Sequence, residues 1–164
     1  MLIFAPAVLA DTLGTAVVSG DIAPTLSLTM TSGTFSFGSM TTGTNVNSTG
    51  NPIDAQVVSN TPWTIVVADA LTDSKPSGTA GKMAEWDGTS AYVSSGKVLT
   101  NPFEMSKDGS TYVALSGTPQ TLFSGTSGTF DNYPALRQTI ASGDEGLLNS
   151  HVYRIVTTFT VSAT

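Results

Sequence analysis

The alternation of apolar and polar residues is clearest near the end of the chain, over residues 153–161. Successive side chains of a strand point to opposite faces, so such a run can place one face on a core and the other partly in water. The residues that share the more apolar face are Tyr153, Ile155, Thr157, Phe159 and Val161. We expect this run to form a long, central, final strand.

A second strong pattern covers residues 63–69, where Ile65, Val66 and Val67 are apolar on both faces. It predicts a buried, central strand. Weaker alternating runs, separated by glycine, proline and Asp-Gly turn signals, predict shorter strands. These runs are residues 13–18, 24–30, 35–37, 53–57, 83–86, 91–93, 97–99, 103–105, 112–115 and 121–123. Residues 124–129 are expected to be a loop, and residues 41–51 a loop or an exposed edge.

Residues 134–141 allow two interpretations. Pro134 is compatible with the first position of a short helix. Leu136, Gln138 and Ile140 alternate with their neighbours, which favours a strand. With the strand interpretation the chain has some ten short strands, which predicts an all-β fold, a single β-sandwich of jelly-roll or Ig-like type.

The first 18 residues differ in character from the rest. Residues 1–10 are almost entirely apolar and end in Val8-Leu9-Ala10, followed by Asp11, which resembles the end of a secretory signal peptide. The run is too short to cross a bilayer as a helix, which takes about 20 residues. It also lacks the positively charged N-terminal region of a signal peptide. It is either a remnant of a signal peptide or an extended apolar arm. We divide the chain into an arm, residues 1–18, and a β-sandwich domain, residues 19–164.

Composition narrows the class of protein further. Serine and threonine account for 46 of the 164 residues, which favours strands and turns over helices. Cysteine is absent, so stability has to come from core burial, metal or assembly with other subunits. The net charge is −6 and the first basic residue is Lys75, which argues against nucleic acid as a partner. An acidic, hydroxyl-rich chain of this kind is typical of a secreted, cell-surface protein.

Catalytic and cofactor signatures are weak. His151 is the only histidine, and no Gly-x-Ser-x-Gly motif accompanies it, so we expect it to be a surface or loop residue and the protein not to be an enzyme. The acidic residues form no Asp-x-Asp-x-Asp run of the calcium-binding kind. We therefore expect neither a metal site nor a cofactor.

The order of several short motifs resembles a known group of surface domains. Leu26-x-Leu28 is followed by Phe35-Ser36-Phe37-Gly38, by Trp63-x-Ile65, and by a closing run from Tyr153 to Phe159-Thr160-Val161. This order resembles the β-sandwich surface domains of the WxL type and related archaeal bundling pili and bacterial biofilm-matrix fibres. The resemblance spans most of residues 13–164. It implies a filament subunit that polymerises by lending an N-terminal strand to the neighbouring copy.

The apolar arm is what such a mechanism requires. A sandwich that lacks one strand exposes unpaired backbone groups and an apolar groove, and a donated strand satisfies both. We expect residues 2–18 to supply the strand and the partner to be a second copy of this chain. The alternative is an N-terminal strand that pairs within its own subunit. The donor residues are predicted to include Leu2, Ile3, Val8, Leu13 and Val17.

The alternative function is a monomeric cell-surface module for adhesion or carbohydrate binding. Trp63, Trp86 and Tyr92 are the aromatic residues considered for a sugar platform, although Trp63 heads a strand and is expected in the core. Surface glycans would be the partner in that case. Asn47-Ser48-Thr49 is an N-glycosylation sequon in a segment expected to be exposed, which makes Asn47 a candidate glycosylation site.

Overall fold

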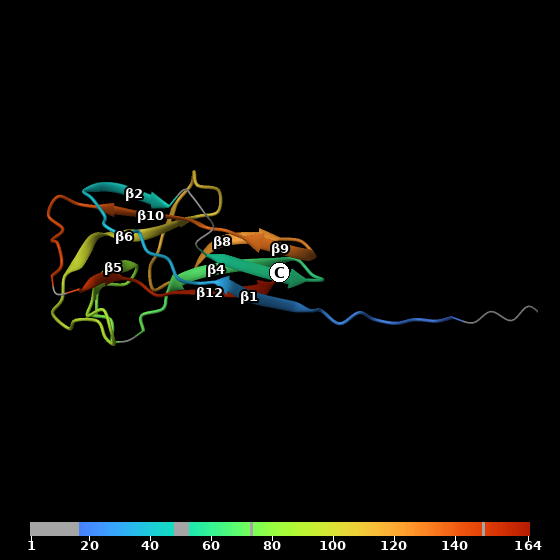
Figure 1. Ribbon diagram of the computed structural model, residues 1–164. Helices are drawn as coiled ribbons and strands as arrows, with labels where there is room; N and C mark the ends of the chain where they lie inside the picture. Colours follow the sequence, from blue (N-terminus) through green and yellow to red (C-terminus); the bar gives the residue numbers. More distant parts are fainter. Residues whose placement is uncertain (1–16, 48–52, 73, 149) are drawn as a thin grey trace, which may run out of the picture.

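The structure, a computed structural model, describes residues 17–47, 53–72, 74–148 and 150–164 (Figure 1). These residues form twelve strands and no helix, which confirms the all-β class. The first six strands are β1 (Leu26–Ser32), β2 (Gly43–Asn47), β3 (Asp54–Ser59), β4 (Trp63–Asp69), β5 (Lys82–Trp86) and β6 (Val98–Ser106). The others are β7 (Val113–Ala114), β8 (Gln120–Gly125), β9 (Gly128–Asn132), β10 (Ala135–Ile140), β11 (Val152–Arg154) and β12 (Thr157–Ala163).

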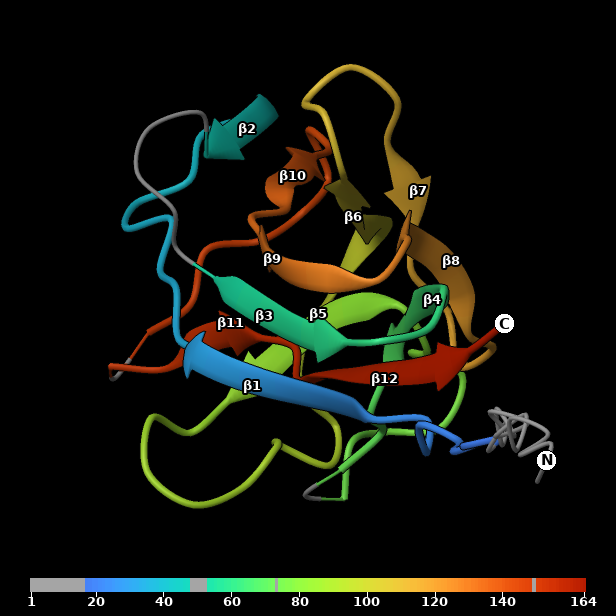
Figure 2. The same ribbon diagram turned by 90° about the vertical axis from the view of Figure 1, so that its right-hand side faces the viewer.

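One half of the domain consists of two antiparallel three-stranded sheets, β1-β3-β9 and β12-β4-β8 (Figure 2). In β4, Trp63, Ile65 and Val67 are buried, as the sequence pattern predicted for this strand. The Trp63 ring contacts the ring of Phe130 in β9, with 5.6 Å between centroids. This contact joins the two sheets face to face, as in a β-sandwich.

The other half is a six-stranded sheet in the order β11-β5-β6-β10-β2, with β7 paired to β6 beside that path. The chain passes from β9 to β10 through Tyr133-Pro134, and from β11 to β12 through Ile155-Val156. The six-stranded sheet is therefore continuous in sequence with both three-stranded sheets. Its core face carries Met83, Leu99, Phe103, Met105 and Leu136, all buried.

The C-terminal run differs from the single central strand that we expected. It forms two pieces, since β11 pairs with β5 whereas β12 pairs with β4, and the partner changes across Ile155-Val156. In β12 the side chains of Thr157, Phe159 and Val161 are half-buried and the alternating ones are exposed, so the faces are as predicted. The position of β12 differs from the prediction of a central strand, because β12 lies at the edge of its sheet.

Several weaker predictions also need correction. Val17 and Val18 lie outside any strand, and residues 13–16 lie outside the described part of the chain. Residues 35–37 form no strand, and residues 91–93 contribute only a bridge between Tyr92 and Trp86. The runs 97–99 and 103–105 belong to one strand, β6, and the loop expected at 124–129 shrinks to the turn between β8 and β9.

Two open interpretations are settled by the strand pairing. Residues 135–140 form a strand, β10, because both of its edges pair, with β6 and with β2. The segment 41–51 contains β2, an edge strand, which agrees with the exposed-edge interpretation. In the part of the chain that the structure describes, there is no helix of the length and apolar character that crossing a membrane requires.

Candidate functional site

An open seam runs along one side of the domain, between strand edges that have no partner within the described part of the chain. One side of this seam is formed by β1 and residues 33–42, and the other by β11, residues 155–156 and β12. β1 and β12 lie side by side, yet they belong to different sheets and form no ladder with each other (Figure 2). Among the described strands, β1 pairs only with β3, and β12 pairs only with β4. Each therefore presents backbone N–H and C=O groups that an added strand can bind.

The seam opens into a cavity of about 780 Å³ where β1 has ended and β12 has not yet begun. This volume falls in the range of ligand pockets, roughly 300–1,000 Å³. The floor is the core face of the six-stranded sheet. Its apolar side chains are Met83, Leu99, Phe103, Met105, Leu136 and Ile140.

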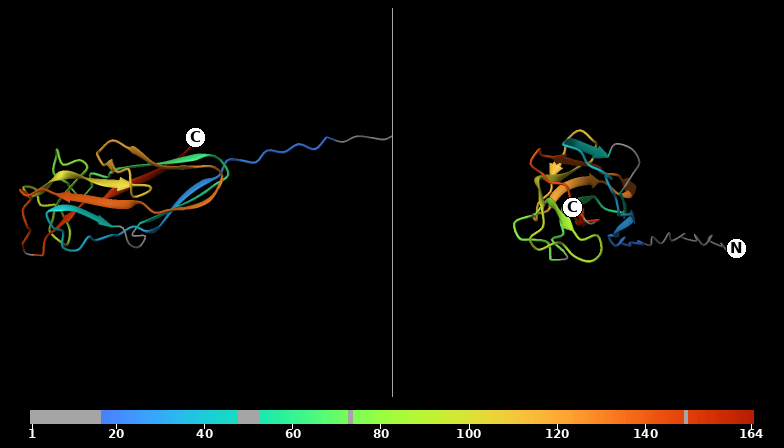
Figure 3. Two further views of the ribbon diagram at one scale, coloured as in Figure 1. Left: turned by 90° about the horizontal axis from the view of Figure 1, so that it is seen from above. Right: turned by 60° about the vertical axis from the view of Figure 1, so that its left-hand side comes forward.

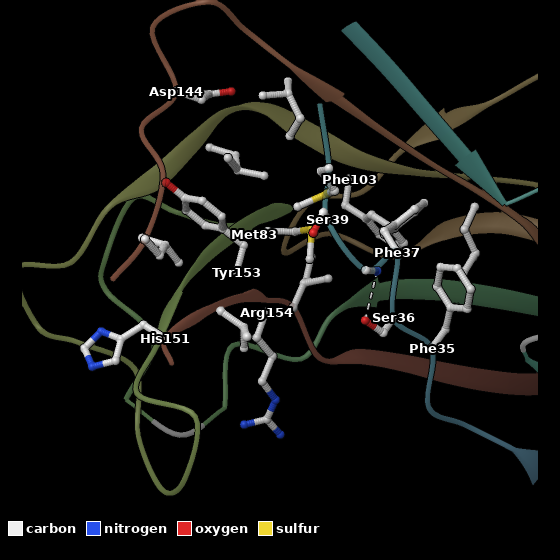
Figure 4. Close-up of a pocket in the computed structure, with 18 of the residues that line it drawn as sticks. Phe35, Ser36, Phe37, Ser39, Met83, Phe103, Asp144, His151, Tyr153 and Arg154 are labelled. Atoms are coloured by element: carbon white, nitrogen blue, oxygen red, sulfur yellow. Dashed lines mark hydrogen bonds between the residues drawn. The ribbon is translucent and has the colours of Figure 1, made fainter. Parts of the chain in front are cut away.

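The walls of the cavity come from residues 33–42, which form no ladder, and from β11 with residues 155–156. On one side, Phe35 and Phe37 pack edge to face at 4.8 Å, and Phe37 contacts Phe103 of the floor at 6.2 Å. On the other side, Tyr153 and Ile155 face the same space. Figure 4 shows Phe37 and Phe103 close together on one side of the cavity and Tyr153 on the other, with its hydroxyl turned away from them. All of the wall side chains remain only half-buried, so the groove is apolar and incompletely covered.

A second, smaller recess continues the cavity along the seam. It is lined by Met30 at the end of β1 and by Thr157 and Phe159 at the start of β12. Gly33, Ile53 and Thr157 line both hollows, so the two form one groove. Because it runs between two strand edges that are free among the described strands, the groove suits an extended chain better than a compact ligand.

Polar groups gather at the rim of the cavity that lies farthest from β12. His151 Nδ1 lies 2.7 Å from Glu85 Oε1, and Lys97 Nζ lies 2.7 Å from Glu145 Oε2. The Tyr153 hydroxyl donates to the Glu145 carbonyl at 2.7 Å. The two contacts of Glu145 fasten residues 144–147, which form part of the wall, to Lys97 just before β6 and to β11. The contact of His151 joins the residue before β11 to β5. Burial, together with the nearby Asp144, Glu85 and Glu145 carboxylates, raises the pKa of Tyr153, which keeps its hydroxyl protonated as the donor.

The Glu85 carboxylate gives the rim a testable pH dependence. Its pKa lies below the ordinary value of 4.5, chiefly because Oε2 accepts the Lys97 backbone N–H at 2.8 Å and also because of His151. A depressed folded-state pKa means that the charged form stabilises the fold above the ordinary value and that this contribution is lost as the pH falls through the folded value. We expect Glu85→Gln to be destabilising at pH 7 and less so at pH 3, because part of the contribution of the charged form is lost below pH 4.5.

The measurement is urea unfolding of wild type and variant at both pH values. Glu104→Gln is a useful comparison, because Glu104 pairs with Arg137 on β10, away from the rim. An equal loss of stability for Glu85→Gln at both pH values would contradict the assignment.

The structure places only part of the predicted donor segment. Leu2, Ile3, Val8 and Leu13 lie outside the described residues, so their role stays a prediction. Val17 is 95% exposed and Ile22 is 87% exposed, and neither contacts the core of its own domain. Residues 17–25 lead away from the domain along its long axis (Figures 1 and 3).

The aromatic residues considered for sugar binding are largely engaged within the protein. Trp63 is buried, as expected for a core residue. The Arg154 guanidinium covers one face of the Trp86 ring, 3.9 Å from its centroid, and Tyr92 packs against the same ring edge to face at 5.2 Å. Asn47 ends β2, and its Nδ2, the atom that would carry a glycan, is buried. Glycosylation there would require this nitrogen to become exposed.

His151, the histidine considered for a catalytic triad, lies in the described ranges beside a carboxylate. His151 pairs with Glu85, not with a serine, and no three His, Cys, Asp or Glu side chains in those ranges come together as metal ligands would. The position of this cavity was not predicted from the sequence. Its only signal was Phe35-Ser36-Phe37 and Met40, apolar residues in a segment that is too short and too rich in glycine to pair as a strand.

Comparison with known proteins found no relative of this chain. No protein-family model matches the chain, and neither a curated protein nor a solved structure matches it significantly.

Proposed function

We propose that this protein is the structural subunit of an extracellular, cell-surface filament, and that each copy completes its neighbour with a strand from residues 2–18. The observation that carries the proposal is the cavity that continues the seam between β1 and β12, each of which has a free edge among the described strands. Segment 17–25, which leads away from its own domain with Val17, Val18 and Ile22 exposed, supports it (Figure 1). The motif order that resembles strand-donating fibre subunits points the same way.

The expected energy of such a joint is sufficient for assembly. A strand of about ten residues that buries a few hundred Å² of apolar surface contributes several kcal/mol, at roughly 25 cal/mol per Å², before ordering costs. Backbone hydrogen bonds to a free edge add to this. Because the contact is heterologous, with the arm on one copy and the groove on the next, it need not close into a ring and can form a filament.

Deletion of residues 1–12 tests the proposal. The full chain is expected to form fibres visible by electron microscopy, whereas the truncated chain is expected to stay a compact particle near the 16.8 kDa mass of one copy, less the deleted residues. Circular dichroism establishes that the truncated chain is folded. Fibres from the truncated chain would refute strand donation. A monomeric, fully folded full-length chain would favour the adhesion or glycan-binding alternative.

Addition of the missing strand as a peptide gives an independent readout. A synthetic peptide of residues 1–18, added to a chain that lacks them, is expected to raise the melting temperature in proportion to the logarithm of peptide concentration. A ligand that binds only the folded state at 100 times its Kd stabilises it by about 2.7 kcal/mol. A peptide with the same residues in scrambled order is the control, and equal shifts from both peptides would contradict a specific groove.

A further inference from the structure

The chain leaves the domain at one end, and both termini of the described fold lie there. Two hydrogen bonds join Thr25 and Asn60. The Asn60 N–H donates to the Thr25 carbonyl at 3.2 Å, and the Thr25 N–H donates to Asn60 Oδ1 at 2.7 Å. The Thr164 N–H donates to the Pro62 carbonyl at 3.0 Å. The turn between β3 and β4 therefore marks this end, which we call the exit end.

The cavity lies toward the opposite end. β1 starts at the exit end, where Leu26 pairs with Ser59, and runs away from it. β12 runs the other way and ends at the exit end, where Ala163 pairs with Trp63. The cavity is lined from Thr157, at the start of β12, back through β11 to residues 144–147. We call this end of the domain the cavity end.

Resting on the proposed function, we propose that the arm of one copy inserts into its neighbour from the cavity end and runs antiparallel to β12. Residues 17–25 lead away from the exit end along the long axis (Figures 1 and 3), so the next copy in line presents its cavity end to the arm. Followed from Thr25 toward the N-terminus, the arm then passes from the cavity end of that neighbour to its exit end. Read from its N-terminus to its C-terminus, the arm therefore runs from the exit end of the neighbour to its cavity end. This is opposite to β12, so the two strands would be antiparallel, and antiparallel pairs are slightly more stable than parallel ones.

The arm is long enough for this path. Residues 2–18, at about 3.3 Å per residue, reach roughly 55 Å, whereas β11 through β12, residues 152–163, span roughly 40 Å. To fill its own groove, the arm would have to reverse direction after residue 17 and pass back along the whole domain. The direction of residues 17–25 thus favours a neighbour as the recipient.

This direction gives the filament two chemically different ends. The copy at one end keeps an empty cavity, and the copy at the other end keeps a free arm. A peptide of residues 1–18 would therefore bind the empty cavity at one end of the filament, whereas the other end offers it no cavity. The domains themselves would follow one another exit end to cavity end.

Cysteine cross-linking tests the direction, because the natural chain contains no cysteine. The donor position is Val17, where the arm leaves its own domain. The acceptor positions are Val152, at the start of β11 near the cavity end and 50% exposed, and Ser162, near the exit end and exposed. Two double variants, V17C/V152C and V17C/S162C, are assembled into fibres, treated with a short bismaleimide and separated on a denaturing gel.

The expected result is a ladder of covalent multimers for V17C/V152C and monomers for V17C/S162C. The reverse pattern would overturn the proposed direction while leaving strand donation intact. Fibres in which neither variant cross-links would also overturn the direction. A cross-linked monomer from V17C/S162C, with no fibres, would show that the arm turns back into its own groove from the exit end, and it would refute both the direction and the filament.

Discussion

Met40→Lys is expected to abolish fibre formation while the domain stays folded. Met40 lies in the irregular segment between β1 and β2, where its half-buried side chain lines the cavity and packs against the core. In the isolated subunit a lysine there can extend its ammonium group through the open seam to water. A donated apolar strand would close that route and bury the charge, at a cost of several kcal/mol. Each 1.4 kcal/mol lowers affinity about tenfold, so the concentration needed for assembly should rise at least about 100-fold.

Thr41→Lys is the matched control. Thr41 is the next residue, is exposed and does not line the cavity. The Thr41→Lys substitution adds the same charge to the same segment, but outside the cavity. It should therefore leave both assembly and stability near those of the wild type. Electron microscopy and sedimentation report on assembly, and circular dichroism confirms the fold of each variant. To separate docking from later steps, binding of the peptide of residues 1–18 is measured with both substitutions in the chain that lacks its arm. Equal binding by the two variants would contradict a role for the cavity in strand capture.

The strands that the sequence predicted best are those whose burial is set by local alternation. β4 was predicted with its correct bounds, because Trp63, Ile65 and Val67 alternate with residues that are themselves mostly apolar. β10 was also predicted correctly, because Leu136 and Gln138 share one buried face. In these elements the two-residue period of a strand and the position of the core agree.

The errors concern pairing, which local patterns do not encode. The run 153–161 has a continuous alternation, yet its partner changes from β5 to β4 at Ile155-Val156, which divides it into β11 and β12. Alternation also gave no indication that β12 lies at an edge. An edge strand and a central strand can have the same pattern when both cover a core on one face.

The candidate site is subject to the same limit. The sequence predicted the apolar arm and the need for an acceptor groove, but not the position of the groove. That position depends on which edges stay unpaired, namely β1 and β12, and these lie more than a hundred residues apart in the chain. In the part of the site formed by residues 33–42, the short alternation of Phe35 and Phe37 predicted a strand, whereas the segment forms a wall of the cavity without pairing.

The largest stability effect is expected from Gly81→Ala. Gly81 has φ of +78°, and a Cβ there would lie 1.9 Å from the Leu115 carbonyl oxygen, a backbone atom that cannot move aside cheaply. Its own backbone is held on both sides, because its N–H donates to Asp69 Oδ2 at 2.7 Å and its carbonyl accepts the Phe103 N–H at 2.7 Å. The left-handed conformation costs about 1–2 kcal/mol for a residue with a Cβ, and overpacking adds about 1–3 kcal/mol.

Gly78→Ala separates these two costs. Gly78 lies in the same loop with nearly the same φ, +75°, but nothing lies within 4 Å of a Cβ built there. The Gly78→Ala variant should lose only the conformational part of the free energy of unfolding, about 1–2 kcal/mol. Urea midpoints of both variants in the arm-deleted chain give the comparison, and equal losses would refute the clash. The distinction matters for the site, because the Gly81 carbonyl accepts a hydrogen bond from the backbone N–H of Phe103, a residue of the cavity floor. A shift of Gly81 should therefore also weaken binding of the donor peptide, whereas Gly78→Ala should leave that binding unchanged.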